Sequence, residues 1–340
     1  MWRLGVSSLP DPGEHLDVEQ AEDVFGRLLD DESIPEDEIG AFLIGLTERS
    51  ETAAEIAGAA RALRARMIRI AAPSGTIDVC GTGGDGHHTL NVSTGVSLAV
   101  AAAGVPVAKH GNRAASSRSG AADTLEQLGL DMDAAGRSAE QSLASLGICF
   151  LFAANHHPAM RRIQPIRRRL GRRTIFNLMG PLSNPAGVER QLIGIARPAY
   201  VPIYAEAQAQ LNSAFTMIVS GDEGLDELSL AGGNEVAEVR GSSFEMRRLD
   251  AGVVGLPRTP VTAIRGGDPR HNAERLRAVL AGTKDAFRDA IVFNGAAALA
   301  VAGRGDGWTE RRSMIEDALD SGRAARLLDQ WIDLARDVAP

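Results

Sequence analysis

The chain has 340 residues, of which 44% are hydrophobic, and it carries a net charge of −8. This length and composition indicate a large core and about two domains, and the acidic balance argues against general binding to nucleic acids or anionic membranes. The two cysteines, Cys80 and Cys149, form no CxxC pair, which argues against a disulfide framework or a cysteine-based zinc site. Because no apolar targeting segment follows Met1 and the longest apolar run, 96–108, is too short to span a bilayer, we expect a soluble cytoplasmic protein.

The first 70 residues contain helix signals only. Three pairs of residues have the spacing of a capping box, namely Asp17 with Gln20, Ser33 with Glu36, and Thr52 with Glu55. Apolar residues recur at helical spacing after each pair. We therefore predict three amphipathic helices that form an N-terminal helical domain, 1–70, whose apolar surface also suits a partner subunit.

Residues 71–340 alternate between short β-rich runs and alanine-rich helices. Strands are expected at 77–80, 105–108, 148–152, 191–195, 215–219 and 291–293, and helices at 94–103 and 119–128. This alternation indicates an α/β domain with a mostly parallel sheet, in which ligands bind beyond the carboxyl ends of the strands.

A glycine-rich loop, Gly81-Thr82-Gly83-Gly84-Asp85-Gly86, follows the first expected strand. Successive N–H groups in such a turn converge on an anion, and a strand that leads through glycines into a helix is a phosphate-binding layout. The string also matches a dinucleotide fingerprint. However, several residues separate Gly86 from the helix, and no acidic residue ends the next strand. The polar segment 91–94 follows directly, so we favour a sugar phosphate over NAD and over a plain glycine turn.

The segment Lys109 to Ser117 is the second polar cluster, and we expect it to form a loop. Two cations, a glycine, an amide and two hydroxyls suit a charged, oxygen-rich ligand, whereas the alternative is an ordinary solvated basic turn. Beside the glycine loop, this segment favours a diphosphate ligand. His110 is equally consistent with a structural histidine.

Asp226 and Glu227 form the third cluster. Adjacent carboxylates after a glycine turn suit Mg²⁺, which prefers oxygen ligands and retains water and substrate phosphates. By composition alone, a solvated acidic turn is the better interpretation, because Asp222 and Glu223 lie nearby. The neighbouring phosphate site is the only observation that favours a metal site at these carboxylates.

Seven arginines lie within 161–173. Most are expected on a solvated face, while one is suited to hold a carboxylate in a two-pronged contact. A nucleic-acid footprint is the alternative. His156 and His157 precede the cluster, but adjacent histidines do not share a helix face, so no zinc pair is expected.

These motifs together resemble the anthranilate phosphoribosyltransferase family. The resemblance includes the N-terminal helices and runs in order over nearly the whole chain. It rests on 81–86, 91–94, 109–117, the segment Arg167 to Asn177, Gly180-Pro181-Leu182-Ser183-Asn184-Pro185, and Asp226-Glu227.

The resemblance implies an enzyme, a pentosyltransferase of tryptophan biosynthesis. Phosphoribosyl diphosphate and anthranilate would give phosphoribosyl-anthranilate and diphosphate. The implied fold is a small helical domain, 1–70, and a larger α/β catalytic domain, 71–340, of the nucleoside phosphorylase/phosphoribosyltransferase class. The segment 155–185 is expected to pack on the helical domain. A homodimer joined through the helical domain, Mg²⁺, and an active site between the domains are also implied.

The resemblance further implies roles for individual residues. Phosphoribosyl diphosphate would be held by Gly81, Gly84, Asp85, Thr89, Asn91, Val92, Ser93, Thr94, Lys109, His110, Gly111, Asn112, Arg113, Ala114, Ala115, Ser116, Ser117 and Ala121. Anthranilate would be held by Gly81, Asn112 and Arg167, and the metal by Ser93, Asp226 and Glu227. No general base is assigned, because an aromatic amine is uncharged at neutral pH.

Three positions depart from the common family pattern. Ala121 stands where serine is frequent, Asn234 where threonine is common, and Gly295 where alanine is common. None removes a core ligand, but they leave room for a paralogue that uses another aromatic amine.

Two other functions remain open from the sequence. A relative that binds nucleic acid without catalysis is supported by 161–173, but the phosphate loop and the net charge oppose it. A pyrimidine nucleoside phosphorylase of similar architecture fits the glycine and lysine segments, yet it fits Asp226-Glu227 and 167–185 poorly.

Overall fold

The computed structural model describes residues 9–114 and 118–338. Three helices open the chain, namely α1 (Val18–Asp30), α2 (Glu36–Arg49) and α3 (Ala53–Arg64). The capping boxes predicted at Asp17 and Thr52 are confirmed, because each side chain accepts the N–H of the third helical residue. The box predicted at Ser33 is wrong. Ser33 instead donates to Asp31 Oδ1, and α2 begins after Pro35 without a side-chain cap.

Within the described residues, the strands form one seven-stranded sheet in the order β3-β2-β1-β4-β5-β6-β7. β3, β2, β1, β4 and β5 run parallel to one another, whereas β6 pairs antiparallel with β5 and β7 pairs antiparallel with β6. Their bounds are β1 (Ile77–Gly81), β2 (Val107–Gly111), β3 (Ile148–Phe152), β4 (Arg190–Gly194), β5 (Ser213–Gly221), β6 (Asn234–Gly241) and β7 (Ser243–Leu249). The predicted α/β class with a mostly parallel sheet is confirmed.

Two expectations about this sheet are wrong. Residues 291–293 lie within a helix, α13 (Ala286–Val301), which is buried on nearly all sides. A short apolar run does not distinguish a buried helix from a strand, which explains the error. Lys109 to Gly111 continue β2 and do not form the expected loop, because they pair with β3 in parallel register.

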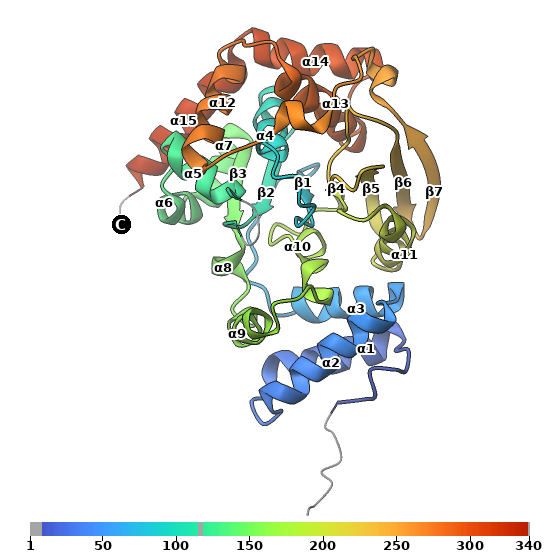
Figure 1. Ribbon diagram of the computed structural model, residues 1–340. Helices are drawn as coiled ribbons and strands as arrows, with labels where there is room; N and C mark the ends of the chain where they lie inside the picture. The colour runs from blue at the N-terminus through green and yellow to red at the C-terminus, as the bar shows by residue number, and fades with distance from the viewer. Residues whose placement is uncertain (1–8, 115–117, 339–340) are drawn as a thin grey trace, which may run out of the picture.

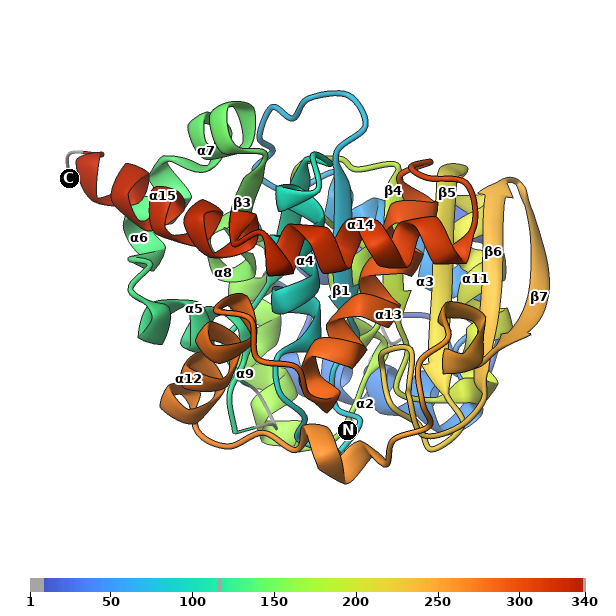
Figure 2. The same ribbon diagram turned by 90° about the horizontal axis from the view of Figure 1, so that it is seen from above.

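Helices cover both faces of the sheet (Figure 1). On the upper face lie α4 (Val92–Ala102), α5 (Ala121–Leu128), α12 (Pro269–Leu280), α13, α14 (Trp308–Asp320) and α15 (Arg323–Asp337). Figure 2 shows α14 and α15 crossing above the strands, and β7 at one edge of the sheet. Beside β3 lie α6 (Met132–Arg137), α7 (Ala139–Leu146) and α8 (Ala153–His156).

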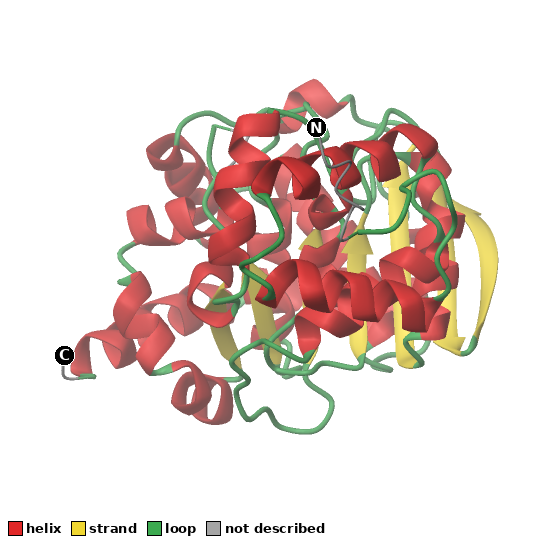
Figure 3. Ribbon diagram, turned by 90° about the horizontal axis from the view of Figure 1, so that it is seen from below, coloured by secondary structure: helices red, strands yellow, loops and turns green. Residues whose placement is uncertain are grey.

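The lower face is covered by elements from distant parts of the sequence. Besides α1–α3 they include α9 (Met160–Leu170), α10 (Met179–Leu182) and α11 (Val201–Gln210), with the short 3-10 helices η1 (Ile175–Asn177) and η2 (Pro198–Tyr200). Two further 3-10 turns, η3 (Ala251–Val254) and η4 (Val261–Ile264), follow β7. Figure 3 shows the helices, in red, over most of the sheet and the outer strands exposed at one edge.

Alternate residues of β4 and β5 pack into two separate hydrophobic cores, one on each face of the sheet. Leu192 and Met217 point into the core shared with α4 and α13, while Ile193 and Ile218 point into the core shared with α1–α3 and α11. This alternation is the period-two pattern of a sheet that is buried on both sides. None of the described helices combines the length and apolar character needed to cross a membrane.

The helix α9 packs against α1 and α2. Arg162 donates to the carbonyls of Leu28 and Ile34, at distances of 3.1 and 2.7 Å. Arg169 pairs with Glu36, so basic side chains of α9 meet carbonyl and carboxylate oxygens of the N-terminal helices. This segment therefore connects the helical bundle to the end of β3.

Candidate active site

The glycine loop lies at the carboxyl end of β1, in the middle of the sheet. Gly83, Gly84 and Gly86 have φ values of 69°, 76° and 78°, in the left-handed region that favours glycine. A Cβ at Gly81 would lie 2.3 Å from Asp226 Oδ2. Glycine at this position therefore lets a carboxylate from the turn after β5 reach the start of the loop.

Gly194 at the end of β4 permits the same approach from the other side. A Cβ there would lie 1.6 Å from the carbonyl oxygen of Asp226. The Asp226 backbone and side chain thus pass between the ends of β1 and β4, the two central neighbours of the sheet. The sequence analysis missed Gly194, because no local pattern marks a close approach to a residue 32 positions away.

Asp226 and Glu227 are anchored to the glycine loop and to the start of α4. The N–H of Gly83 donates to Asp226 Oδ2 at 2.7 Å, and the N–H of Ser93 donates to Glu227 Oε1 at 3.2 Å. Burial raises the pKa of Asp226, and repulsion from Asp85 raises it further. Burial and the Asp226 charge likewise raise the pKa of Glu227. This crowding of acidic oxygens favours a bound cation.

Lys109 is the protein's own cation beside these carboxylates. Its side chain is buried, and Nζ donates to Val79 O at 2.9 Å and to Ser93 Oγ at 3.1 Å. The Lys109 charge acts on Glu227, whose pKa it lowers against the larger effect of burial. Lys109 therefore links β2 to β1 and α4 beside the carboxyl groups of Asp226 and Glu227.

Asn91 organises the polar segment that precedes α4. Its Oδ1 accepts the Thr124 hydroxyl at 2.6 Å and the Asn272 amide at 2.9 Å. Thr94 is buried, and its hydroxyl has no hydrogen-bond partner among the described residues. Thr89 forms an isolated antiparallel bridge with Arg265. Val92, the first residue of α4, is buried and contributes its backbone and core packing.

The segment after β2 is exposed, but its charge is partly satisfied within the protein. Arg113 pairs with Glu126 at 2.5 Å and Asp123 at 3.3 Å, and its guanidinium lies 5.6 Å from the Phe152 ring. Asn112 accepts the N–H of Arg113. The expected ligand residues Ala115, Ser116 and Ser117 lie outside the described residues.

The following turn also uses Asp123. This carboxylate accepts the N–H of Ala114 and of Gly120, each at 2.9 Å. Ala121 is the first residue of α5 and is partly buried. At the Ala121 position no hydroxyl extends toward the loop.

His110 and His157 form a buried pair below this segment. His110 Nδ1 lies 2.9 Å from the Gly180 carbonyl, and the two Nε2 atoms are 3.3 Å apart. Burial lowers the pKa of His110 to about 4 and that of His157 to about 3. Both rings are therefore neutral at pH 7, and the His110 side chain faces Gly180.

Arg167 on α9 has a half-buried guanidinium without a hydrogen bond or ion pair to the described residues. Burial lowers its pKa from the usual arginine value. Arg162, Arg169 and Arg172 of the same cluster differ, because each bonds a carbonyl or carboxylate oxygen. A partly desolvated arginine without a partner suits a carboxylate ligand.

Arg173 is a contributor that the sequence analysis did not assign. Its guanidinium donates to the carbonyls of Gly84 at 3.2 Å and Gly83 at 3.4 Å. These bonds hold two carbonyl oxygens of the glycine loop. The arginine-rich cluster was the available signal, but it did not distinguish Arg173 from its neighbours.

Two asparagines fix the turn that carries the carboxylates. Asn294 accepts the N–H of Leu228 and donates to its carbonyl. Asn234 does the same for Ser229, at 2.6 and 3.1 Å. Asn234, which departs from the common family pattern, thus has a structural role next to Asp226 and Glu227.

Acidic side chains alone do not make a complete metal cage here. Among the described residues, no group of three or more histidine, cysteine and acidic side chains is arranged to hold a metal ion. Mg²⁺ commonly takes one or two carboxylates and completes its shell with water and substrate phosphates. Asp226 and Glu227 fit such a partial donor set.

Comparisons with known proteins agree with this geometry. Residues 74–325 match the model of the glycosyl transferase family a/b domain, and residues 12–67 match that of the glycosyl transferase family helical bundle domain. The chain is 67% identical over 330 residues to an anthranilate phosphoribosyltransferase of Erythrobacter litoralis, covering 97% of this chain and 100% of the relative. It is 63% identical to that of Novosphingobium aromaticivorans, covering 96% and 99%.

Solved structures show the same fold. A crystal structure of anthranilate phosphoribosyltransferase from Thermus thermophilus superposes with a TM-score of 0.87 and 40% identity, covering 95% of this chain and 97% of that one. The Saccharomyces cerevisiae enzyme in complex with PRPP and Mg has a TM-score of 0.85 and 28% identity, covering 95% and 94%. The chain belongs to the anthranilate phosphoribosyltransferase family.

Proposed function

We propose how the residues at the carboxyl ends of the strands perform the reaction of this family. The enzyme transfers the phosphoribosyl group of 5-phosphoribosyl 1-diphosphate to the amine of anthranilate, giving N-(5-phosphoribosyl)anthranilate and diphosphate in tryptophan biosynthesis. The observation that supports our assignment is the approach of Asp226 to the glycine loop after β1 and of Glu227 to the start of α4.

The diphosphate is held by the loop and the start of α4. The N–H groups of the loop and of the start of α4, other than those of Gly83 and Ser93 that bond Asp226 and Glu227, supply donors for phosphate oxygens. Lys109 supplies a buried positive charge. The remaining contacts are assigned to residues around these two elements. They are Gly81, Gly84, Asp85, Thr89, Asn91, Val92, Ser93, Thr94, His110, Gly111, Asn112, Arg113, Ala114 and Ala121.

Mg²⁺ fits beside Ser93, Asp226 and Glu227, because burial and neighbouring carboxylates raise the pKa values of the two acidic side chains, and a bound cation offsets both effects. When bound, the ion would neutralise charge on the diphosphate leaving group. The structure of the yeast relative with PRPP and Mg supports this assignment. Before the ion binds, the backbone N–H groups of Gly83 and Ser93 hold Asp226 and Glu227 in place.

Anthranilate is assigned to Arg167 and Asn112, with Gly81 close to the reacting centre. Arg167 would hold the carboxylate, and Asn112 presents an exposed amide after β2. Loss of diphosphate leaves an electron-poor anomeric carbon, and positioning of the neutral amine beside it is the protein's main contribution. The aromatic amine is already uncharged at neutral pH, so no general base is assigned to its attack.

The active site is assigned to the cleft between the helical domain, 1–70, and the catalytic domain, 71–340. The separate family matches to 12–67 and 74–325 support this division. We assign a homodimer joined through the helical domain, for which the resemblance to the family is the support. Light scattering on the purified chain should give the mass of two copies, and a monomer at working concentrations would contradict the assignment.

A fluorescence assay tests the function. The purified chain is mixed with phosphoribosyl diphosphate, Mg²⁺ and anthranilate, and the loss of anthranilate fluorescence is followed. Activity is expected with wild type and a large loss with Glu227→Gln, since the variant keeps the shape of the side chain but removes its charge. A panel of aminobenzoates then identifies the preferred amine. Unchanged anthranilate fluorescence under varied conditions would contradict the assignment.

A further inference from the structure

A segment from the C-terminal part of the chain reaches the residues that lead into α4. The segment 264–267 lies beside 88–90, where the N–H of Gly266 donates to the carbonyl of His88 at 2.8 Å. A Cβ at Gly266 would lie 2.7 Å from Thr89 O, so glycine permits this close approach. The helix α12 follows and packs against α5 (Figures 1 and 2). Side chains of α12 and α5 can therefore act on the start of α4.

Asn272 of α12 is the side chain that makes this connection. It is buried, its Oδ1 accepts the N–H of Gly267 at 2.8 Å, and its Nδ2 donates to Asn91 Oδ1 at 2.9 Å. A backbone N–H can only donate, so the contact with Gly267 fixes which end of the Asn272 amide faces each neighbour. Asn272 therefore offers an N–H to Asn91, and the Asn91 atom that meets it must be the oxygen.

Thr124 of α5 supplies a second donor to the same oxygen. Its hydroxyl donates to Asn91 Oδ1 at 2.6 Å, so both acceptor positions of this oxygen are used. The Asn91 Nδ2 group faces the other way. Among the described residues it donates to the Ser119 carbonyl alone, at 3.5 Å, which is long for a hydrogen bond. At least one N–H of the Asn91 amide is thus left for an acceptor oxygen of a ligand.

We propose that Asn272 and Thr124 are positioning residues for phosphoribosyl diphosphate, because they hold the Asn91 amide with its N–H₂ group toward an oxygen of this substrate. This role rests on the proposed function, in which Asn91 contacts the substrate. The terminal torsion of an asparagine is broad and roughly two-fold, so it does not by itself decide which end of the amide faces the ligand. Without the two donors, Asn91 also presents its oxygen to the anionic substrate, and binding weakens.

Calorimetric titration with phosphoribosyl diphosphate and Mg²⁺, without anthranilate, tests this role through a double-mutant cycle. Asn272→Ala should weaken binding roughly fivefold in the wild-type background, as expected for one lost hydrogen bond, but less than about twofold when Asn91→Ala is already present. Arg270→Ala, at an exposed position in the first turn of α12, is the control and should bind as wild type. An equal loss in both backgrounds would overturn the proposal, since a structural effect does not depend on the Asn91 amide.

Thr124 provides a matched pair of variants that leaves Asn272 in place. Asn272→Ala also deprives the Gly267 N–H of its acceptor, whereas Thr124→Val keeps the shape of the side chain and removes only the hydroxyl. Thr124→Val should weaken binding of phosphoribosyl diphosphate, and Thr124→Ser, which keeps the hydroxyl, should restore it. Equal affinities for Thr124→Val and Thr124→Ser would overturn the proposal.

The single variant Asn91→Ala separates this proposal from the proposed function. Wild-type affinity for phosphoribosyl diphosphate in Asn91→Ala would remove Asn91 from the substrate contacts and overturn the positioning role with it, while activity in the fluorescence assay would still support the reaction. Weaker binding in Asn91→Ala together with wild-type affinity in Asn272→Ala would overturn the positioning role of Asn272 and leave the assignment of Asn91 supported.

Discussion

Gly194 illustrates how a single missing Cβ positions a carboxylate. Gly194→Ala would place a methyl group 1.6 Å from the Asp226 carbonyl, so the turn after β5 must move away from β4. We expect a loss of about 1–3 kcal/mol in the free energy of unfolding, the usual range for overpacking, together with a large loss of activity. Urea denaturation and the fluorescence assay measure the two effects.

Gly136→Ala is the matched control, because the nearest atom to its new Cβ would lie at 3.4 Å, an ordinary contact. Gly136 is in α6, where alanine is favourable. If Gly194→Ala were as stable and active as Gly136→Ala, the close approach of Asp226 would not describe the protein in solution.

Arg167 carries a second prediction at the residue scale. Arg167→Ala should weaken the use of anthranilate by roughly 1.5–3 kcal/mol, the range for a hydrogen bond to a charged group, seen as a higher KM for anthranilate. The KM for phosphoribosyl diphosphate should change much less. Arg168→Ala on the same helix is exposed and serves as the control. An unchanged KM for anthranilate in Arg167→Ala would remove the assignment.

The residues that were predictable from sequence are those whose neighbours in the chain share their role. The glycine loop and the pair Asp226-Glu227 are compact strings with a recognisable composition. Arg173, by contrast, acts on carbonyls 89 and 90 positions away, and Asn294 acts on Leu228. Such partners are decided by the fold, so nothing in the adjacent sequence marks them.

At the scale of elements, the histidine pair joins β2 to the segment after α8. Burial holds the pKa of His110 at about 4 and that of His157 at about 3, below the ordinary value of about 6.5. In the unfolded chain both rings take up protons as the pH falls below about 6.5, whereas the folded rings do so only near pH 4 and 3. The unfolded state thus binds more protons in this window.

The free energy of unfolding should therefore fall as the pH is lowered from about 6.5 toward 4. Urea midpoints at pH 7 and pH 5 measure this fall, which should be smaller in the double variant His110→Asn/His157→Asn. His271→Gln, at an exposed position on α12, should behave as wild type. An equal fall in wild type and the double variant would show that other groups cause the acid sensitivity.

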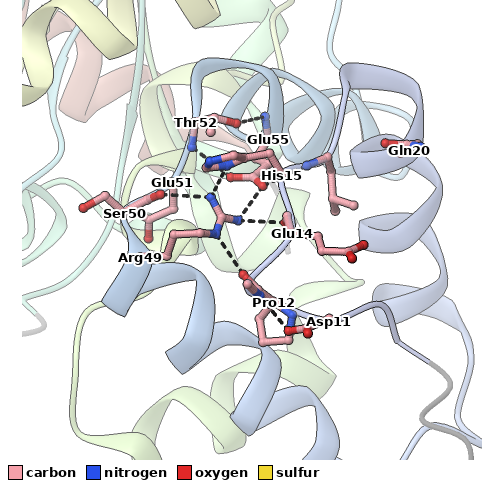
Figure 4. Close-up of polar contacts among 12 residues, drawn as sticks. Asp11, Pro12, Glu14, His15, Gln20, Arg49, Ser50, Glu51, Thr52 and Glu55 are labelled. Carbon is pink, nitrogen blue, oxygen red and sulfur yellow. Dashed lines mark hydrogen bonds and ion pairs between the residues drawn. The ribbon is translucent and has the colours of Figure 1, made fainter.

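Arg49 of α2 links the segment 12–16, which precedes α1, to Glu55 of α3 (Figure 4). Arg49 donates to Pro12 O at 2.8 Å and to Glu55 Oε1 at 2.6 Å, and it contacts His15 Nδ1. The Glu55 side chain is fully buried and also accepts the N–H of Leu16. Arg49→Ala leaves this carboxylate buried without its cation and should cost about 3–5 kcal/mol in the free energy of unfolding.

Arg172 provides the comparison for that ion pair. Arg172 and Glu48 are both more than half exposed, with side-chain exposures of 51% and 60%. Arg172→Ala should therefore cost only about 0–1 kcal/mol. Equal urea midpoints for the Arg49→Ala and Arg172→Ala variants would contradict the importance of the buried contact.

Elements were predictable where periodicity and caps agreed. The helices after Asp17 and Thr52 combine both signals, and the central strands are short apolar runs between glycines. The antiparallel strands β6 and β7 were missed, because β7 is exposed along nearly its whole length and shows no buried face. The apolar run at 291–293 was misassigned, because α13 is buried between the sheet and other helices and lacks a polar stripe.

At the scale of the whole molecule, the expected boundary near residue 70 does not coincide with a boundary between cores. One continuous core contains residues of α1–α3 together with Ile193, Ile218 and Tyr204 from the lower side of the sheet and α11. The core on the upper face contains no residue of the helical bundle. The residue pattern along the sequence indicates where helices end and strands begin, but it does not show which apolar faces pack together.

This shared core predicts how the molecule unfolds. Because α1–α3 bury their apolar faces in the same core as α11 and the lower side of β4 and β5, loss of the bundle would open this core to water. Hydrogen exchange in increasing urea should therefore show peptides from 18–64 and from β5 losing protection together. The upper-face helices α14 and α15, which carry Trp308 and Trp331, provide an independent reference through tryptophan fluorescence. Full exchange of 18–64 at a urea concentration that leaves β5 protected would mean that the bundle unfolds separately, and that its contacts with α11 contribute little to stability.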